Sequence, residues 1–153
     1  MSKVFKYQKY LQEYPDCPPK SYAETNFQVF RWVNENAINK SFLPLNLLKY
    51  PPMGFDKTDD MCKSYGLSVF NTFENALAKY KKLYLMKGGL SHEDFIEGKG
   101  DSIALLDLKI THGVIGDLNK QGHLTLHEYI GTDLIETIVN ITKIIDKHGK
   151  FIV

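Results

Sequence analysis

The stretch His-Leu-Thr-Leu-His-Glu-Tyr at residues 123–129 decides the fold class, because apolar and polar residues alternate along it. A period of two predicts a β-strand, whose successive side chains point to opposite faces. Leu124, Leu126 and Glu128 then share one face, so a carboxylate follows two leucines toward the expected core. Because an unpaired buried charge is costly, we expect Glu128 to be paired, protonated or at the edge of a cleft. Residues 114–115 predict its hairpin partner.

Further strands are predicted where β-branched and aromatic residues gather. Residues 26–33 read Asn-Phe-Gln-Val-Phe-Arg-Trp-Val and are apolar on both faces, as is typical of a central strand. Arg31 is the charged exception in this segment. Another strand is predicted at 102–110. Residues 134–145 are ambiguous between helix and strand, and their many β-branched residues favour strand.

The most regular helix is predicted at about 72–85, directly after a short strand at 65–70. Asn71 with Glu74 three residues later matches a capping box, and apolar side chains then recur on one helical face. Prolines and Gly54 interrupt the region before it, where we expect turns and short helical pieces. The elements together predict an α+β domain with a twisted, mainly antiparallel sheet, one main amphipathic helix at about 72–85 and short helices.

Residues 1–25 differ in composition from the rest of the chain. Three prolines prevent a continuous helix there, and aromatic residues are frequent. We therefore predict an N-terminal arm at 1–25 and a single globular domain at 26–153, because 153 residues suit one core. The arm carries four tyrosines: Tyr7, Tyr10, Tyr14 and Tyr22.

Composition narrows the partners and the compartment. Nineteen Lys plus Arg against eighteen Asp plus Glu give a net charge of +1, which does not indicate a nucleic-acid partner. An apolar signal segment is absent from the N-terminus, and no run of eighteen apolar residues occurs, so we expect no membrane span. Cys17 and Cys62 stand far apart and outside any Cys-x-x-Cys motif, which favours two free thiols in a cytoplasmic protein.

Metal and nucleophile motifs are weak. His123 and His127 lie four residues apart on the predicted strand, about 13 Å at 3.3 Å per residue, which is too far to share one ion. Nothing near Cys62 would lower the pKa of its thiol, so a structural role is favoured over a nucleophilic one. The glycines form no phosphate-binding loop. We therefore expect no metal site.

Four residues form a more informative set: Arg31, Ser68, Thr72 and Glu128. Their order, with a helix after Thr72, resembles the Arg, Ser-x-Thr, Glu pattern of ADP-ribosyltransferases. The resemblance implies that Arg31 holds the phosphates or ribose of NAD with Thr72 nearby, that Ser68 braces the nicotinamide end, and that Glu128 hydrogen-bonds the ribose. Such a carboxylate would stabilise an oxocarbenium-like centre while the nicotinamide bond breaks.

Two functions remain open on this evidence. A protein-interaction or accessory module, docking a partner protein through the tyrosine-rich arm, ranks slightly ahead of an NAD-using, ADP-ribosyltransferase-like enzyme. In a purely structural interpretation, Arg31 pairs with an acid such as Glu128, while Ser68 and Thr72 serve a strand end and a helix start. An enzyme predicts a pocket where Arg31, Ser68 and Glu128 converge, whereas a module predicts an exposed apolar patch. The oligomeric state stays open.

Overall fold

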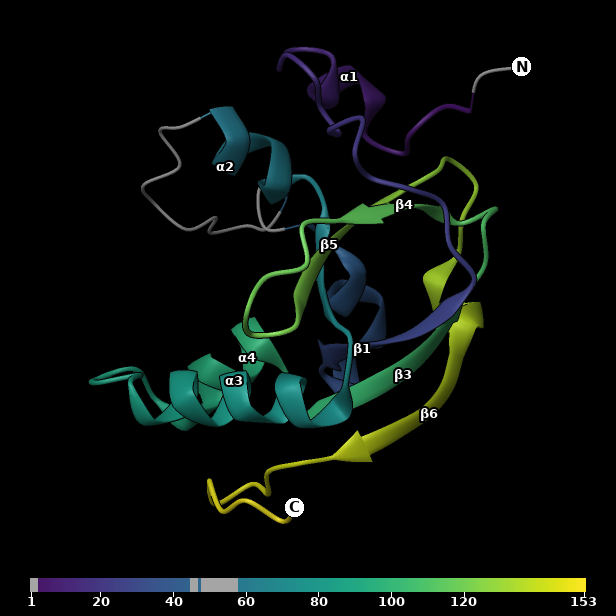
Figure 1. The fold of residues 1–153 in the computed structure, drawn as a ribbon. Helices are drawn as coiled ribbons and strands as arrows, with labels where there is room; N and C mark the ends of the chain where they lie inside the picture. Colours follow the sequence, from purple (N-terminus) through teal and green to yellow (C-terminus); the bar gives the residue numbers. More distant parts are fainter. Residues whose placement is uncertain (1–2, 45–46, 48–57) are drawn as a thin grey trace.

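Six apolar or alternating segments pair into one antiparallel sheet with the order β4-β5-β2-β1-β3-β6 (Figure 1). The computed structural model describes residues 3–44, 47 and 58–153 of the chain. The predicted α+β class is confirmed. The strands are β1 (Phe27–Val33), β2 (Leu67–Phe70), β3 (Ser102–Leu108), β4 (Gly113–Gly116), β5 (His123–Glu128) and β6 (Ile138–Lys143).

Four of the described helical elements begin after a polar residue whose side chain accepts a hydrogen bond from a backbone N–H, namely Asn34, Thr72, Ser91 and Asp133. The predicted main helix is confirmed, and Thr72 rather than Asn71 caps it, because the Thr72 hydroxyl accepts a 3.1 Å hydrogen bond from the Asn75 N–H. Asn71 instead accepts a hydrogen bond from the Asn75 side chain. The helical elements are α1 (Gln8–Leu11), η1 (Glu35–Phe42), α2 (Thr58–Ser64), α3 (Phe73–Leu85), α4 (His92–Lys99) and η3 (Leu134–Thr137).

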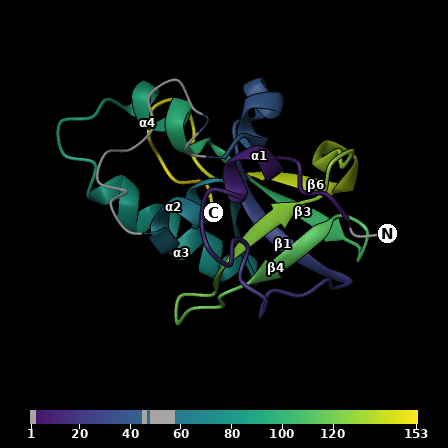
Figure 2. The same ribbon diagram turned by 90° about the horizontal axis from the view of Figure 1, so that it is seen from above.

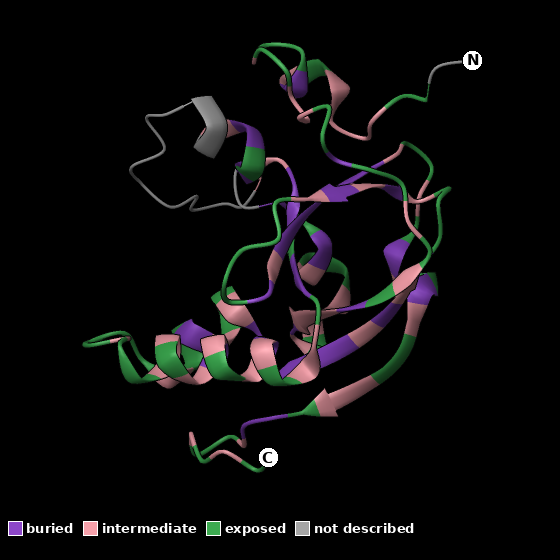
Figure 3. Ribbon diagram, viewed as in Figure 1, coloured by how far each residue is buried: buried purple, intermediate pink, exposed green. Residues whose placement is uncertain are grey.

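The sheet is covered on both faces, so it separates two hydrophobic cores. One core joins Val29, Leu67 and Leu126 of the strands to Phe42 of η1 and Leu134 of η3. The other lies under α3 and α4, which Figure 2 shows on one side of the strands. Figure 3 shows buried residues on the strands, and the burial is most continuous along β5, where every residue after His123 is buried. The strand β5 is therefore buried on both faces and not on the leucine face alone.

The junction between β1 and β2 is the weakest pairing in the described sheet. These strands share only the register pair Phe30–Phe70, whereas β1 and β3 pair along seven residues. Figure 1 shows β4 and β5 in one half of the sheet and β3 and β6 in the other, turned relative to one another. The side chain of Arg31 lies at this junction.

The predicted N-terminal arm packs onto the domain. Phe5 and Ala23 form isolated antiparallel bridges with Tyr129 and Ile115. The side chains of Leu11 and Tyr22 are buried. The rings of Tyr10 and Tyr65 stack with their centroids 4.9 Å apart. Aromatic residues of segment 3–25 thus pack on their own sheet and on Tyr65, directly after α2.

Two expectations need correction. Cys17 and Cys62 are not free thiols: they form a disulfide, because folding brings their Cα atoms to 5.7 Å although 45 residues separate them. Residues 134–145 are strand only in part, because the Asp133 side chain accepts from the N–H of Ile135 and starts η3 before β6 begins. No helix in the described part of the chain is long and apolar enough to cross a bilayer.

Candidate functional site

Arg31 projects from β1 at the point where β1 and β2 separate. Its Nε donates to the carbonyl of Ser41 at 2.8 Å, and its Nη1 donates to the carbonyl of Ser68 at 2.7 Å. Burial lowers the pKa of Arg31 to about 10, and the Glu128 carboxylate opposes that shift. The guanidinium therefore stays protonated at neutral pH and holds two segments together across the gap between the strands.

Glu128 ends β5 on the same face of the sheet as Arg31. The residue is 4 % exposed, and its Oε2 accepts a 2.7 Å hydrogen bond from the Lys6 ammonium. Its Oε1 is buried and has no hydrogen-bond partner among the described residues. Burial raises the pKa of Glu128, while Lys6 and then Arg31 oppose the rise. The ion-pair partner of Glu128 is thus Lys6 and not Arg31, the partner considered from the sequence.

The segment around Lys6 covers this carboxylate. Lys6 donates its backbone N–H to the carbonyl of Glu128 at 3.0 Å and its ammonium to the carbonyl of Thr132 at 2.7 Å. Tyr7 follows, and the pKa of Tyr7 is raised to about 12, mainly by burial and further by the Glu128 charge. The N-terminal segment therefore covers the Glu128 carboxylate and places the Lys6 ammonium in contact with it.

Ser68 and Thr72 have other partners. The Ser68 side chain lies on the opposite face of the sheet, where its hydroxyl is 2.9 Å from Nε2 of His123. Thr72 caps α3 through its hydroxyl. Of the four residues in the predicted set, Arg31 contacts the main-chain carbonyl of Ser68 and interacts electrostatically with Glu128 without forming an ion pair with it, and Thr72 lies in a helix cap.

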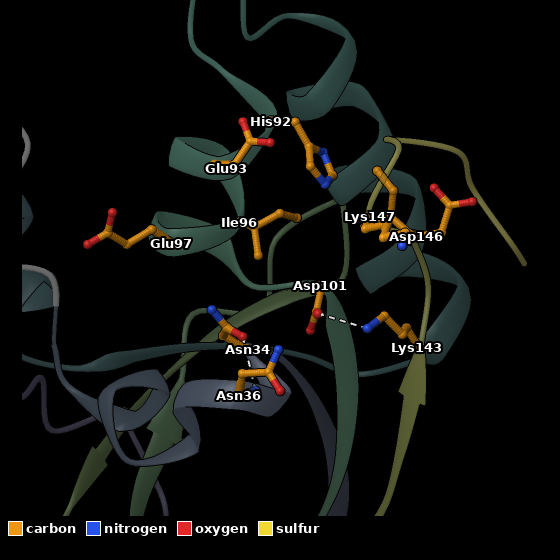
Figure 4. A pocket seen from close by; sticks show the side chains of 11 residues that line it. Asn34, Asn36, His92, Glu93, Ile96, Glu97, Asp101, Lys143, Asp146 and Lys147 are labelled. Carbon is orange, nitrogen blue, oxygen red and sulfur yellow. Dashed lines mark hydrogen bonds and ion pairs between the residues drawn. The ribbon is translucent and has the colours of Figure 1, made fainter.

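A separate cavity of about 320 Å³ lies between α4, the start of β3 and the end of β6 (Figure 4). Its lining includes His92, Asp101 and Lys143, and it includes none of the four predicted residues. The Asp101 carboxylate accepts hydrogen bonds from the Glu35 N–H and the Ser102 hydroxyl, and it pairs with Lys143 at 3.3 Å. Since Asp101 is fully engaged, this cavity shows no buried polar group that awaits a ligand.

A third candidate group consists of the disulfide and one imidazole beside it. The sulfurs of Cys17 and Cys62 and a ring nitrogen of His127 lie within 4.8 Å of one another. We call these three residues the sulfur–imidazole cluster. His127 is 2 % exposed, and both of its ring nitrogens lack a hydrogen-bond partner among the described residues. Burial lowers the pKa of His127 to about 4.

Sequence patterns located some of these residues and missed others. Arg31 and Glu128 stand out because each is a charge in an apolar strand. Lys6 and Asp101 give no such signal, because one lies in an irregular segment and the other precedes a strand in a polar turn. Comparison of the chain with protein-family models, with curated proteins and with solved structures finds no match.

Proposed function

We propose that this protein is an NAD-using, ADP-ribosyltransferase-like enzyme whose site is built from Arg31 and Glu128. One observation carries the proposal: a guanidinium from β1 and a buried carboxylate from β5 share one face of the sheet and interact electrostatically. Arg31 lies where β1 and β2 separate, and Glu128 ends β5; the cavity of about 320 Å³ lies elsewhere, so the pair of charges and not a pocket supports the proposal. This is the combination of charges that a dinucleotide and its reacting ribose require.

Glu128 has the chemistry of the reacting end. Its unpartnered Oε1 can accept a hydrogen bond from a ribose hydroxyl, which would satisfy a buried acceptor. In the reaction, the bond between C1′ of the ribose and the nicotinamide nitrogen breaks, and neutral nicotinamide leaves with the electron pair. An acceptor then attacks C1′ and releases its proton. The nearby carboxylate stabilises the positive charge that develops on the ribose.

Arg31 has the chemistry of the phosphate end. Only two of its N–H groups have hydrogen-bond partners among the described residues, namely the carbonyls of Ser41 and Ser68. The remaining N–H groups suit the planar, paired recognition of phosphate oxygens. Lys6 adds a second cation, and it pairs with Oε2 of Glu128, which leaves Oε1 for the ribose hydroxyl.

The proposal names the donor chemistry and leaves the acceptor open. In the family pattern the position two residues before the glutamate is usually Gln or Glu, and here it is Leu126. Transfer to arginine is therefore not proposed. The tyrosines that suggested a docking arm contact their own domain, which reduces the reason to assign them to a partner protein.

Calorimetric titration of NAD into the protein tests the proposal. We expect saturable binding by the wild type and loss of binding in Arg31→Ala. In Glu128→Gln we expect retained binding and at least about 100-fold slower release of nicotinamide, the usual loss when one charge-stabilising group is removed. Glu136→Gln, which alters an exposed carboxylate on η3, is the matched control and should behave as the wild type.

The opposite result is equally informative. Absence of heat at millimolar NAD together with absence of nicotinamide release would reject the transferase proposal. It would favour the interaction or accessory role, for which the next experiment is a search for a protein partner.

A further inference from the structure

The sulfur–imidazole cluster joins three segments that are distant in the sequence. Cys17 follows α1, Cys62 lies in α2, and His127 lies in β5. Their ligand atoms are all within 4.8 Å of one another. Thiolate and imidazole are the preferred ligands of Zn²⁺, and three protein ligands within this range match the spacing of a tetrahedral site. The sequence alone suggested no metal site, because it paired His127 with His123 rather than with the cysteines.

His127 is a buried member of this cluster. Its imidazole is buried, yet neither ring nitrogen has a hydrogen-bond partner among the described residues. Native proteins leave few buried polar groups unpaired, because each unpaired group has lost its hydrogen bonds to water without replacement. Gly66 makes the space for the ring: a Cβ atom at this position would lie 3.1 Å from Cε1 of His127. A metal ion on one ring nitrogen would satisfy the acceptor nitrogen of the imidazole.

We propose that reduction of the Cys17–Cys62 disulfide converts the sulfur–imidazole cluster into a Zn²⁺ site with two thiolates and the His127 imidazole as ligands. The disulfide takes up two electrons and two protons and gives two thiols, while an added phosphine becomes its oxide with an oxygen atom from water. Zn²⁺ then replaces the two thiol protons, which are released. Three protein ligands leave the fourth position of a tetrahedral site to water, and Cys17 is only partly buried.

The redox state decides whether the metal can bind. In the disulfide both sulfurs are bonded to each other and carry no negative charge, so they are poor zinc ligands. After reduction each thiolate supplies a full charge, and the fold holds the two sulfurs and the ring together. The site is therefore controlled by redox state: Zn²⁺ binds when the two cysteines are reduced and is released when they are oxidised to the disulfide.

Cobalt(II) is the probe for this proposal, because it occupies zinc sites and has visible and near-ultraviolet bands. The intact chain is reduced with a phosphine, freed of reductant under inert gas and titrated with Co²⁺. The expected result is binding of one equivalent with tetrahedral d–d bands and a thiolate charge-transfer band, both lost on addition of Zn²⁺. The oxidised protein should show neither band.

Variants identify the ligands. His127→Gln should weaken Co²⁺ binding at least about 100-fold, since loss even of an outer-shell partner costs 10–100-fold. Cys62→Ser should abolish the charge-transfer band of a two-thiolate site. His148→Gln is the matched control, because this imidazole is exposed and lies outside the cluster. Circular dichroism before and after metal addition shows whether reduction unfolds the chain, and recovery of structure with metal would support the site.

Three results would overturn the proposal. They are equal Co²⁺ binding by the oxidised and reduced proteins, unchanged affinity in His127→Gln, and a reduced chain that stays unfolded with metal present. The first two would place the bound ion elsewhere, and the last would make the disulfide a purely structural link.

Discussion

Acidification should destabilise the oxidised protein through His127, and the structure sets the size of this effect. Burial lowers the pKa of His127 from an ordinary value of 6.5 to about 4. At pH values between these two pKa values, His127 is protonated in the unfolded chain and neutral in the folded protein. The free energy of unfolding therefore falls as the pH falls from 6.5 to 4, and this contribution to stability is fully present above pH 6.5.

The magnitude follows from the width of this window. A shift of about 2.5 pH units at about 1.4 kcal/mol per unit corresponds to roughly 3 kcal/mol. No allowance for solvent screening is needed, because His127 is 2 % exposed. The Glu128 carboxylate acts in the opposite direction, since burial raises its pKa, so the comparison must be made between variants and not on the wild type alone.

The assay is urea unfolding followed by circular dichroism from about pH 7.5 to about pH 4.5, with the disulfide intact and a chelator present. Across this range His127→Leu should lose less stability than the wild type, by roughly 3 kcal/mol. His148→Leu, which removes an exposed imidazole, should keep the wild-type dependence. If His127→Leu and the wild type lost stability in parallel, the imidazole would not be a neutral, buried group and the reasoning would fail.

Three further perturbations are expected to alter stability, each measured by urea unfolding. Thr72→Ala removes the cap of α3 and should cost about 1 kcal/mol, whereas Thr72→Ser should cost little; equal losses would reject the capping role. Lys6→Met leaves Glu128 without its ion-pair partner and should cost about 1–2 kcal/mol, which is less than for a fully buried pair because the Lys6 side chain is 30 % exposed. Adding Glu128→Gln should recover part of that loss, and additive effects in the double variant would contradict the pairing. Gly98→Ala should stabilise the protein by about 1 kcal/mol, because Gly98 lies inside α4 with open space where a Cβ would sit. Gly100→Ala should destabilise it by more than that, because Gly100 has φ +88° and lies against the carbonyl that ends β1. Effects of the same sign would contradict these different roles of the two glycines.

Local patterns in the sequence determined the class of the fold and its clearest elements. The period-two alternation of residues 123–129 appears as β5, and the helical spacing after Thr72 appears as α3. These elements could be predicted because side-chain periodicity depends only on near neighbours in the chain. For the same reason, Arg31 and Glu128 stood out as charges within apolar strands.

Only the tertiary structure decided which of these residues meet. The order β4-β5-β2-β1-β3-β6 places Arg31 and Glu128 on one face, and it turns the Ser68 side chain to the other. The Lys6–Glu128 pair spans 122 residues and the Cys17–Cys62 disulfide spans 45. No local pattern carries such contacts, because they arise from which strands become neighbours and from how the N-terminal segment folds back. The burial of β5 on both faces, and with it the unpartnered His127, has the same origin.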